Sequence, residues 1–247
     1  MDTNSSAENL TRHYERIYKV EDDFRNYNLS LLVSSLAHGI RVLDLGCGSG
    51  FLLDFLSKRG YKTIGIEPNE ELIRLAKQRN PGLDIRKGDA EDIDSLVLDK
   101  VDTVLAVDVV EHINNDVAIF KKILRHLSPG GRFIVVVPAY PRLYGRRDKK
   151  YGHFKRYSKN NLENMLVNEG FRVKHGRYWN MLGVLPYIFY EKILKKELET
   201  KFREKRSGAA NSFFKKVLQL WFRFIENKIN LGFGLSIIIV AEKKQSV

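Results

Sequence analysis

A glycine-rich segment, Val42–Gly50, combines residue types that suit the binding of a cationic ligand. Gly46, Gly48 and Gly50 follow a short apolar run, and glycine lets the backbone turn sharply and approach a ligand with no Cβ in the way. Their GxGxG spacing differs from the GxGxxG of dinucleotide-binding loops. Asp44 places a carboxylate beneath the loop, which would attract a cationic amino group and repel a pyrophosphate.

Two further acidic positions follow the next apolar runs along the chain. Glu67 ends the second run, 21 residues after Gly46, where its carboxylate can accept hydrogen bonds from both hydroxyls of a ribose. Asp89 and Ala90 follow the third run and can meet the edge of an adenine with a carboxylate and a backbone N–H. Because the carboxyl ends of parallel strands meet at one edge of a sheet, we expect these groups to line a single nucleoside site.

The order and spacing of these groups, from about Leu36 to His175, resemble the class I S-adenosylmethionine-dependent methyltransferases. The resemblance implies S-adenosylmethionine as cofactor and an α/β fold: a Rossmann-like, seven-stranded, mostly parallel sheet with helices on both faces. It also implies that the glycine-rich loop holds the methionyl part, Glu67 the ribose and Asp89 the adenine. The cofactor-binding residues implied in this way are Asp44, Gly46, Cys47, Gly48, Gly50, Glu67, Pro68, Asp89, Ala90 and Val107.

Methyl transfer mainly requires alignment of the acceptor with the methyl group, and a base only if the acceptor must lose a proton. After the fourth apolar run, Asp108, Glu111 and His112 can supply an acid/base pair. The same pattern resembles the metal-binding segment of the ubiquinone-biosynthesis O-methyltransferases. The alternative is that Glu111 and His112 only form the first residues of a helix beside the cofactor. Three side chains supply too few ligands for a divalent ion that prefers oxygen atoms, so we predict no metal.

A second segment, 138–158, is dense in Arg, Lys and aromatic residues. Loops on a rigid scaffold concentrate binding groups, and Arg146, Arg147 and Arg156 can clamp a phosphate bidentately. His153 can act as a base near neutral pH. The alternative is a lid that packs its aromatic rings on the sheet and turns its basic groups to solvent. We predict His112, His153, Asp108 and Tyr157 as catalytic, and Tyr140, Tyr144, Arg146, Arg147, Arg156 and Trp179 as substrate-binding.

The elements that position these residues alternate between β-rich apolar runs and helical patterns, which indicates βαβ units and a parallel sheet. The expected strands are Arg41–Leu45, Thr63–Glu67, Asp84–Lys87, Val101–Val107, Arg132–Val137, Phe171–His175 and Leu235–Ala241. The expected helices are Ala7–Val20, Phe24–Ala37, Phe51–Arg59, Glu70–Arg79, Asp116–Leu127 and Lys159–Glu169. The chain is interpreted as one domain, with N-terminal helices (1–38), a cofactor-binding core (39–177), a helical insert (178–232) and the last strand with its tail (233–247).

The insert is roughly 55 residues long, more than a connection between two strands needs. It contains an aromatic stretch, Trp179–Tyr190, a charged stretch, Glu191–Arg206, and an amphipathic helix pattern, Ser212–Ile229. The amphipathic helix is of a kind that lies in a membrane interface. The alternative is that the aromatic stretch and this helix both pack on the sheet as part of the hydrophobic core. The predicted apolar face comprises Phe214, Val217, Leu218, Trp221, Phe224, Ile225 and Ile229, opposed by Lys216, Gln219, Arg223 and Glu226.

Positive charge is concentrated in the second half of the chain. Residues 1–130 carry 17 Lys+Arg and 21 Asp+Glu, a net of −4, whereas residues 131–247 carry 25 and 9, a net of +16. This asymmetry indicates an anionic partner, namely a phosphorylated substrate, an anionic membrane surface or nucleic acid, or else a solvated basic face. The single cysteine and the polar N-terminus fit a cytoplasmic protein, peripheral at the inner face of the membrane.

Two segments resemble one branch of the methyltransferases, found with lipid-linked sugar and polyprenyl-phosphate pathways: Gly152–Ser158 and Ile225–Ser236. The branch resemblance says little about the acceptor. The leading hypothesis is methylation of oxygen, with carbon or nitrogen as the alternative, on a small or lipid-linked acceptor that could be phosphorylated. A nucleic-acid methyltransferase is the second hypothesis, because the aromatic insert could stack bases. It is disfavoured by the absence of an Asn-Pro-Pro-Tyr segment and by the position of the only cysteine, Cys47, inside the glycine loop. A non-catalytic cofactor-binding module is the third, since fold does not fix function.

Overall fold

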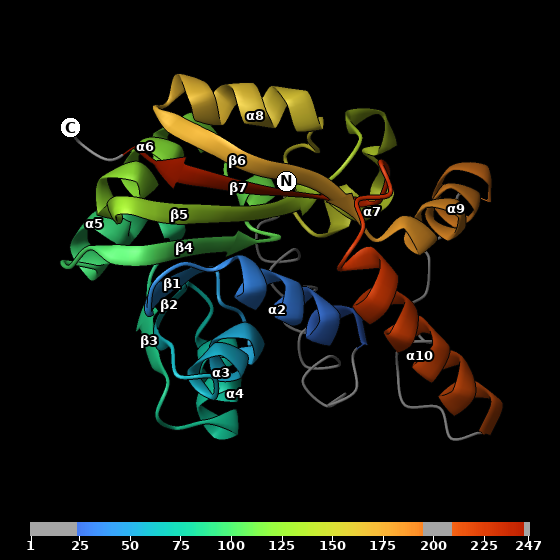
Figure 1. The fold of residues 1–247 in the computed structure, drawn as a ribbon, viewed down its shortest axis with the longest axis horizontal. Helices are drawn as coiled ribbons and strands as arrows, with labels where there is room; N and C mark the ends of the chain where they lie inside the picture. The colour runs from blue at the N-terminus through green and yellow to red at the C-terminus, as the bar shows by residue number, and fades with distance from the viewer. Residues whose placement is uncertain (1–23, 195–208, 245–247) are drawn as a thin grey trace.

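A seven-stranded sheet forms the centre of the computed structural model, which describes residues 24–194 and 209–244 (Figure 1). The strand order is β3-β2-β1-β4-β5-β7-β6; β1 to β5 run parallel, and β7 is antiparallel to both of its neighbours. The prediction of a mostly parallel, seven-stranded sheet is therefore confirmed. The strands are β1 (Arg41–Leu45), β2 (Lys62–Glu67), β3 (Asp84–Lys87), β4 (Val101–Val107), β5 (Leu127–Pro138), β6 (Phe171–Trp179) and β7 (Ser236–Lys243).

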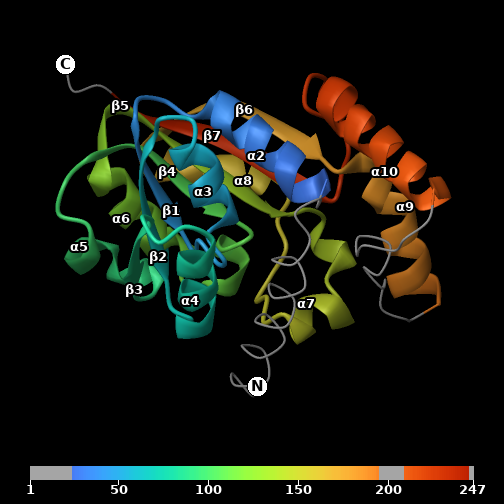
Figure 2. The same cartoon turned by 90° about the horizontal axis from the view of Figure 1, so that it is seen from below.

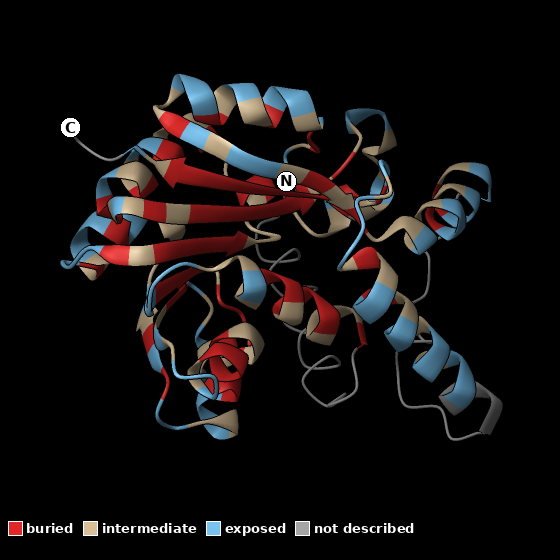
Figure 3. Ribbon diagram, in the orientation of Figure 1, coloured by how far each residue is buried: buried red, intermediate tan, exposed pale blue. Residues whose placement is uncertain are grey.

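Helices cover both faces of the sheet, as expected, because the central strands are apolar on both sides. Burial is nearly continuous along β1, β4, β5 and β7, as the red strands of Figure 3 show. On one face the core includes side chains of α2 (Phe24–Leu36) and α3 (Phe51–Ser57). On the other face it includes side chains of α5 (Ile93–Leu96), α6 (Asp116–His126) and α8 (Lys159–Asn168). The sheet is thus the middle layer of three.

The strand register brings the predicted cofactor groups to one edge of the sheet. Asp44 on β1 pairs with Gly65 on β2 and with Leu105 on β4, so these three strands end at similar heights. The helix α4 (Glu70–Arg79) starts soon after β2, and its N-cap Asn69 accepts hydrogen bonds from two backbone amides of the first turn. A short helix, η1 (Ala90–Asp92), follows β3.

Several element boundaries differ from those expected. The strand β5 begins at Leu127 rather than Arg132, because Leu127 already pairs with Val101 before a register shift. The strand β6 continues to Trp179, which pairs with Ser236 of β7, so the insert starts after Trp179. Among the helices, α2 and α3 end one and two residues earlier than expected, and α8 one residue earlier. The expected helix 7–20 lies outside the described residues.

The insert and the loop after β5 gather at the end of the molecule where the parallel strands finish (Figures 1 and 2). After β5 come η3 (Pro141–Leu143) and α7 (Arg146–Lys150). The insert contains η4 (Met181–Gly183), α9 (Val184–Tyr187), η5 (Ile188–Ile193), α10 (Ala209–Trp221) and η7 (Phe222–Glu226). Within residues 24–194 and 209–244, no helix has the length and apolarity needed to span a bilayer.

The amphipathic pattern predicted over 212–229 is corrected in two respects. The α-helix gives way to a π-helical turn, η7, so the spacing of three and four does not hold to the end of the pattern. Glu226, expected on the polar side, is buried and accepts hydrogen bonds from the backbone N–H groups of Asn180 (2.6 Å) and Met181 (2.9 Å). Trp221, expected on the outer apolar face, packs against the core and donates its indole N–H to Glu226 (3.1 Å).

Candidate active site

The glycine-rich loop after β1 needs glycine for both conformation and space. Gly46, Gly48 and Gly50 have φ angles of 63°, 55° and 71°, in the left-handed region that side chains rarely adopt. A Cβ on Gly46 would lie 2.6 Å from a methyl carbon of Val109, and one on Gly50 would lie 2.8 Å from the Cβ of Ala76. The loop therefore turns sharply at the edge of the sheet where β1, β2 and β4 end, and residues 47–50 are buried there.

Glu67 joins the end of β2 to this loop. Its Oε2 accepts a hydrogen bond from the backbone N–H of Gly48 (2.8 Å), and its Oε1 accepts one from Asn69 (3.0 Å). Burial raises the pKa of Glu67, and the hydrogen bonds from Asn69 and Gly48 offset only part of that effect. Next to it, the backbone N–H of Gly88 donates to the carbonyl of Glu67 (3.2 Å), which ties the end of β3 to the end of β2.

Asp44 is an acid in a strongly unfavourable setting for negative charge. Its side chain is buried, and burial together with the negative charge of Glu67 raises its pKa to about 8. A cationic amino group placed beside Asp44 would relieve both effects, whereas a phosphate would worsen them. The acids of this edge therefore fit a ligand with a positive charge. Burial and the charges of Asp44 and Glu67 also raise the pKa of Cys47, which makes its thiol unreactive.

The remaining predicted cofactor residues lie on the same edge. Asp89 is exposed at the start of η1, and its carbonyl accepts a hydrogen bond from the N–H of Asp92 (2.9 Å). Ala90 and Val107 are half-buried and Pro68 is exposed, each directly after or at the end of its strand. The structure thus brings together the ends of β1, β2, β3 and β4 as the sequence predicted.

Asp108, directly after β4, does not join the metal-binding set proposed from its sequence pattern. It has a φ of 54°, and its Oδ2 lies 3.3 Å from the guanidinium of Arg25 at the start of α2. The potential ligand atoms that do come together belong to Glu111, His112 and His153, all within 4.8 Å of one another. His153 therefore replaces Asp108 in this cluster.

Glu111 and His112 on η2 (Val110–His112) both lie in surroundings that oppose their charged forms. Glu111 is fully buried, its two carboxyl oxygens accept no hydrogen bond from any described residue, and burial followed by the charge of Asp108 raises its pKa well above the usual value. Burial and then the charge of His153 lower the pKa of His112 to about 4. The rings of His112 and His153 meet edge to face, with centroids 4.7 Å apart.

His153 is oriented by a carboxylate that the sequence analysis missed. The Nδ1 atom of His153 lies 3.0 Å from Oδ1 of the buried Asp148. A carboxylate at this position keeps the proton on Nδ1 and leaves Nε2 as an acceptor. The signal for Asp148 was its charge, since it is the one acidic residue in the basic segment 138–158.

Arg156 does not have the free guanidinium that a phosphate clamp requires. It is buried, and its Nε donates to Asp148 (2.7 Å), Nη1 to the carbonyl of Ala139 (3.2 Å) and Nη2 to the hydroxyl of Tyr187 (2.7 Å). All three nitrogens thus bind protein acceptors. The prediction that Arg156 contacts substrate is wrong, because its charge is needed to neutralise Asp148.

Two other predicted site residues are also core residues. Tyr157 is 2% exposed and donates its hydroxyl to Asp116 (2.9 Å), and burial with the charge of Asp116 raises its pKa far above the usual value, so it is not a catalytic acid or base. Trp179 is fully buried and donates its indole N–H to Asn227 (3.0 Å), so it cannot contact a substrate.

The other predicted substrate residues lie in the same segment as His153, 138–158. Tyr144 donates its hydroxyl to the carbonyl of His153 (2.8 Å), and Tyr140 stacks on Tyr178 with ring centroids 5.6 Å apart. Arg146 is exposed at the start of α7, and Arg147 lies 5.6 Å from the ring centre of Tyr151. Their contact with a substrate stays a prediction.

The fold and the edge-of-sheet site define a class I methyltransferase of the S-adenosylmethionine-dependent type. Residues 14–175 match a family model described as a methyltransferase domain, and the chain belongs to that family. A crystal structure of an S-adenosylmethionine-dependent methyltransferase from Archaeoglobus fulgidus has the same fold, with a TM-score of 0.60 at 20% identity over 93% of this chain and 98% of that chain. A plantazolicin methyltransferase solved with S-adenosylhomocysteine has a TM-score of 0.61 at 16% identity, over 96% and 91% of the two chains. S-adenosylmethionine is accordingly the cofactor.

Curated relatives match this chain over part of their length. A ubiquinone biosynthesis O-methyltransferase of Bradyrhizobium diazoefficiens is 39% identical over 102 residues, which is 39% of each chain. A protein of the same name from Aeromonas salmonicida is 30% identical over 111 residues, 43% of this chain and 47% of the relative. The chain thus spans less than half the length of these two relatives.

Proposed function

We propose that this methyltransferase acts on a hydroxyl group of a small or lipid-linked acceptor, with His153 as the base that takes the hydroxyl proton. The observation that carries this proposal is the contact of 3.0 Å between His153 and the buried carboxylate of Asp148, at the end of the sheet where the cofactor groups lie. The similarity to two ubiquinone biosynthesis O-methyltransferases supports oxygen as the methylated atom.

The cofactor residues have separate roles in this proposal. S-adenosylmethionine supplies an electrophilic methyl group on a sulfonium. Asp44 binds its cationic amino group, because this positive charge would offset the burial and the negative charge of Glu67 that raise the pKa of the acid. The loop glycines contact the methionyl part, Glu67 accepts hydrogen bonds from the ribose, and Asp89 with Ala90 binds the adenine.

His153 performs the proton transfer. Its Nδ1–H is held by Asp148, so Nε2 accepts the proton of the acceptor hydroxyl as the new O–C bond forms and the C–S bond breaks. Asp148 then stabilises the imidazolium. His112 is a poorer base at neutral pH, because its pKa is lowered to about 4. Burial raises the pKa of Glu111, which opposes a competing negative charge beside the ring.

The methylated atom can be identified with a cofactor that carries a carbon-13 methyl group. The protein is incubated with this cofactor and a panel of phenols, sugars and polyprenyl-linked alcohols, and the product is analysed by NMR. We expect a methoxy carbon from at least one of the hydroxyl acceptors. Products that carry the label only on nitrogen or carbon would contradict the proposal.

A further inference from the structure

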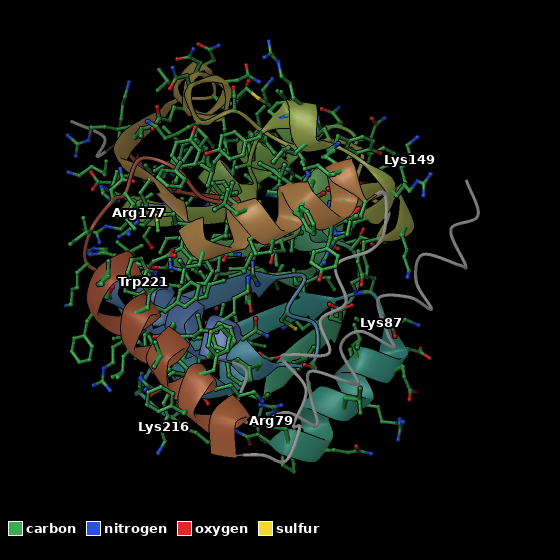
Figure 4. All side chains as sticks on the ribbon, turned by 90° about the vertical axis from the view of Figure 1, so that its right-hand side faces the viewer. Arg79, Lys87, Lys149, Arg177, Lys216 and Trp221 are labelled. Atoms are coloured by element: carbon green, nitrogen blue, oxygen red, sulfur yellow. The ribbon has the colours of Figure 1, made fainter. Side chains whose placement is uncertain are left out.

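An apolar surface remains exposed on the helices of the insert. On α9 and η5, Leu185 is 78% and Ile193 64% exposed. Figure 4 shows these helices and α10 on the same side of the molecule, with Lys216 on α10. We call this surface the insert face; its exposed apolar residues are Leu185, Phe189, Ile193, Leu194, Phe213, Phe214, Val217, Leu220 and Phe224.

The helix α10 is apolar on two sides, which is unusual for a helix in water. Its inner side chains, Leu218 and Trp221, pack against the core beneath α2. Its outer side carries Phe213, Phe214 and Leu220, which are 71%, 53% and 53% exposed. A helix with apolar side chains on both its inner and its outer side requires an apolar environment on both sides, and large exposed apolar patches mark sites of interaction.

The charge of the insert identifies the kind of partner. The described residues 192–194 and 209–228 contain five Lys+Arg and one Asp+Glu, a net of +4. The one acid among them, Glu226, is buried, whereas Lys216, Arg223 and Lys228 are exposed. A second copy of the chain would bring like charges together at this face. An anionic bilayer offers both an apolar layer for the phenylalanines and negative headgroups for the basic residues.

We therefore infer that the insert face docks on the surface of an anionic membrane. Two hydrogen bonds join the face to the proposed catalytic pair: Arg156 donates to the hydroxyl of Tyr187 on α9 and to the carboxylate of Asp148. Lys192 of η5 also donates to the carbonyl of Tyr144 (2.9 Å). Docking thus holds the site at the bilayer surface, where a lipid-linked acceptor would be presented; this last step rests on the proposed function.

Sedimentation with lipid vesicles tests the docking without any methyl transfer. We expect the wild-type protein to sediment with vesicles of phosphatidylcholine and phosphatidylglycerol, and far less with pure phosphatidylcholine. Added salt should weaken binding only in part, because it screens the attraction between charges more than about 8 Å apart at physiological ionic strength and leaves the apolar contact. A Phe213→Ser, Phe214→Ser, Phe224→Ser variant should lose binding at least about tenfold.

A matched control removes exposed apolar side chains elsewhere. Ile40, Leu98 and Val167 are 54%, 86% and 52% exposed, and none belongs to the insert face. The triple Ser variant at these positions should bind vesicles as wild type does, and both variants should still bind cofactor in calorimetry. Wild type that stays in the supernatant with anionic vesicles at low salt would overturn the inference. Equal loss in both variants, or a wild-type dimer that the Phe variant abolishes, would overturn it as well.

Discussion

Oε2 of Glu67 accepts a hydrogen bond from the backbone N–H of Gly48 at 2.8 Å, so the acid after β2 also fixes the loop after β1. Two sequence motifs that are 19 positions apart therefore act as one unit. A cofactor that binds Glu67 through its ribose would meet a carboxylate already aligned with the loop. This coupling means that a change at Glu67 affects both the ribose contact and the glycine-rich loop.

Replacing Glu67 by Gln should weaken cofactor binding about 10- to 100-fold, a loss of about 1.5–3 kcal/mol. The amide keeps one acceptor oxygen where the carboxylate has two, so either the Gly48 or the Asn69 contact is lost. Calorimetry measures the affinity. The matched control is Glu70→Gln, an exposed neighbour paired with Lys87, which should bind as wild type does. Unchanged affinity in Glu67→Gln would refute the assignment of the ribose site.

Cofactor binding should release a proton near neutral pH. The pKa of Asp44 is raised to about 8 by burial and by Glu67, so in the free protein the carboxyl is protonated below that pH and must ionise to bind an amino group. Affinity should therefore rise with pH up to about 8. Titrations at pH 7 in two buffers of different ionisation enthalpy measure the released proton. Asp44→Asn should release none and bind at least about tenfold more weakly. If wild type also releases no proton, Asp44 does not bind the amino group.

The raised pKa of Asp44 also predicts that the stability of the cofactor-free protein depends on pH. Because the folded state holds the Asp44 proton more tightly than the unfolded chain does, the free energy of unfolding should fall as pH rises from about 4 to about 8. The Asp44→Asn variant should lack the part of this decrease in unfolding free energy that comes from Asp44. Urea unfolding at several pH values measures it, and parallel curves for the two proteins would contradict the raised pKa.

Replacing Arg156 by Met should destabilise the protein by about 3–5 kcal/mol, because it leaves the buried carboxylate of Asp148 without its cation. Burial opposes ionisation of Asp148, but the contacts with His153 and Arg156 outweigh it and lower its pKa. The stabilisation is therefore present above the ordinary pKa of an Asp and lost as pH falls below it. In urea unfolding, Arg74→Met on exposed α4 is the control and should change little. A small effect of Arg156→Met at neutral pH would mean that Asp148 is not held by this pair.

Chelators should leave activity unchanged. A divalent ion at Glu111, His112 and His153 would need the carboxylate form of Glu111, which burial disfavours. Activity with and without EDTA tests this, together with an anomalous-diffraction search in crystals soaked with Mn²⁺. Loss of activity that Mg²⁺ restores, or a peak among these three side chains, would establish a metal site.

Local sequence patterns predicted that the loop glycines and the strand-end acids lie at one edge of the sheet, because their placement depends on short-range features. The glycines after β1 and the acids after β2 and β3 follow from strand ends and backbone conformation, which a linear motif contains. The positions of the residues predicted to bind the methyl acceptor depend instead on contacts between segments far apart in the sequence. Nothing local distinguishes Arg156, which binds Asp148 and Tyr187, from the exposed Arg146, and the burial of Trp179 depends on η7, about 45 residues away.

The rate of methyl transfer by a His153→Gln variant tests the proposed chemistry most directly. With saturating cofactor and a hydroxyl acceptor, single-turnover rates are measured across pH for wild type, His153→Gln and the control His175→Gln, an exposed histidine on β6. We expect His153→Gln to be slower by about 100-fold or more and to lack the inflection of the wild-type profile, while the control keeps both. A His153→Gln rate within twofold of wild type, with the same pH profile, would contradict the role of His153 as the base.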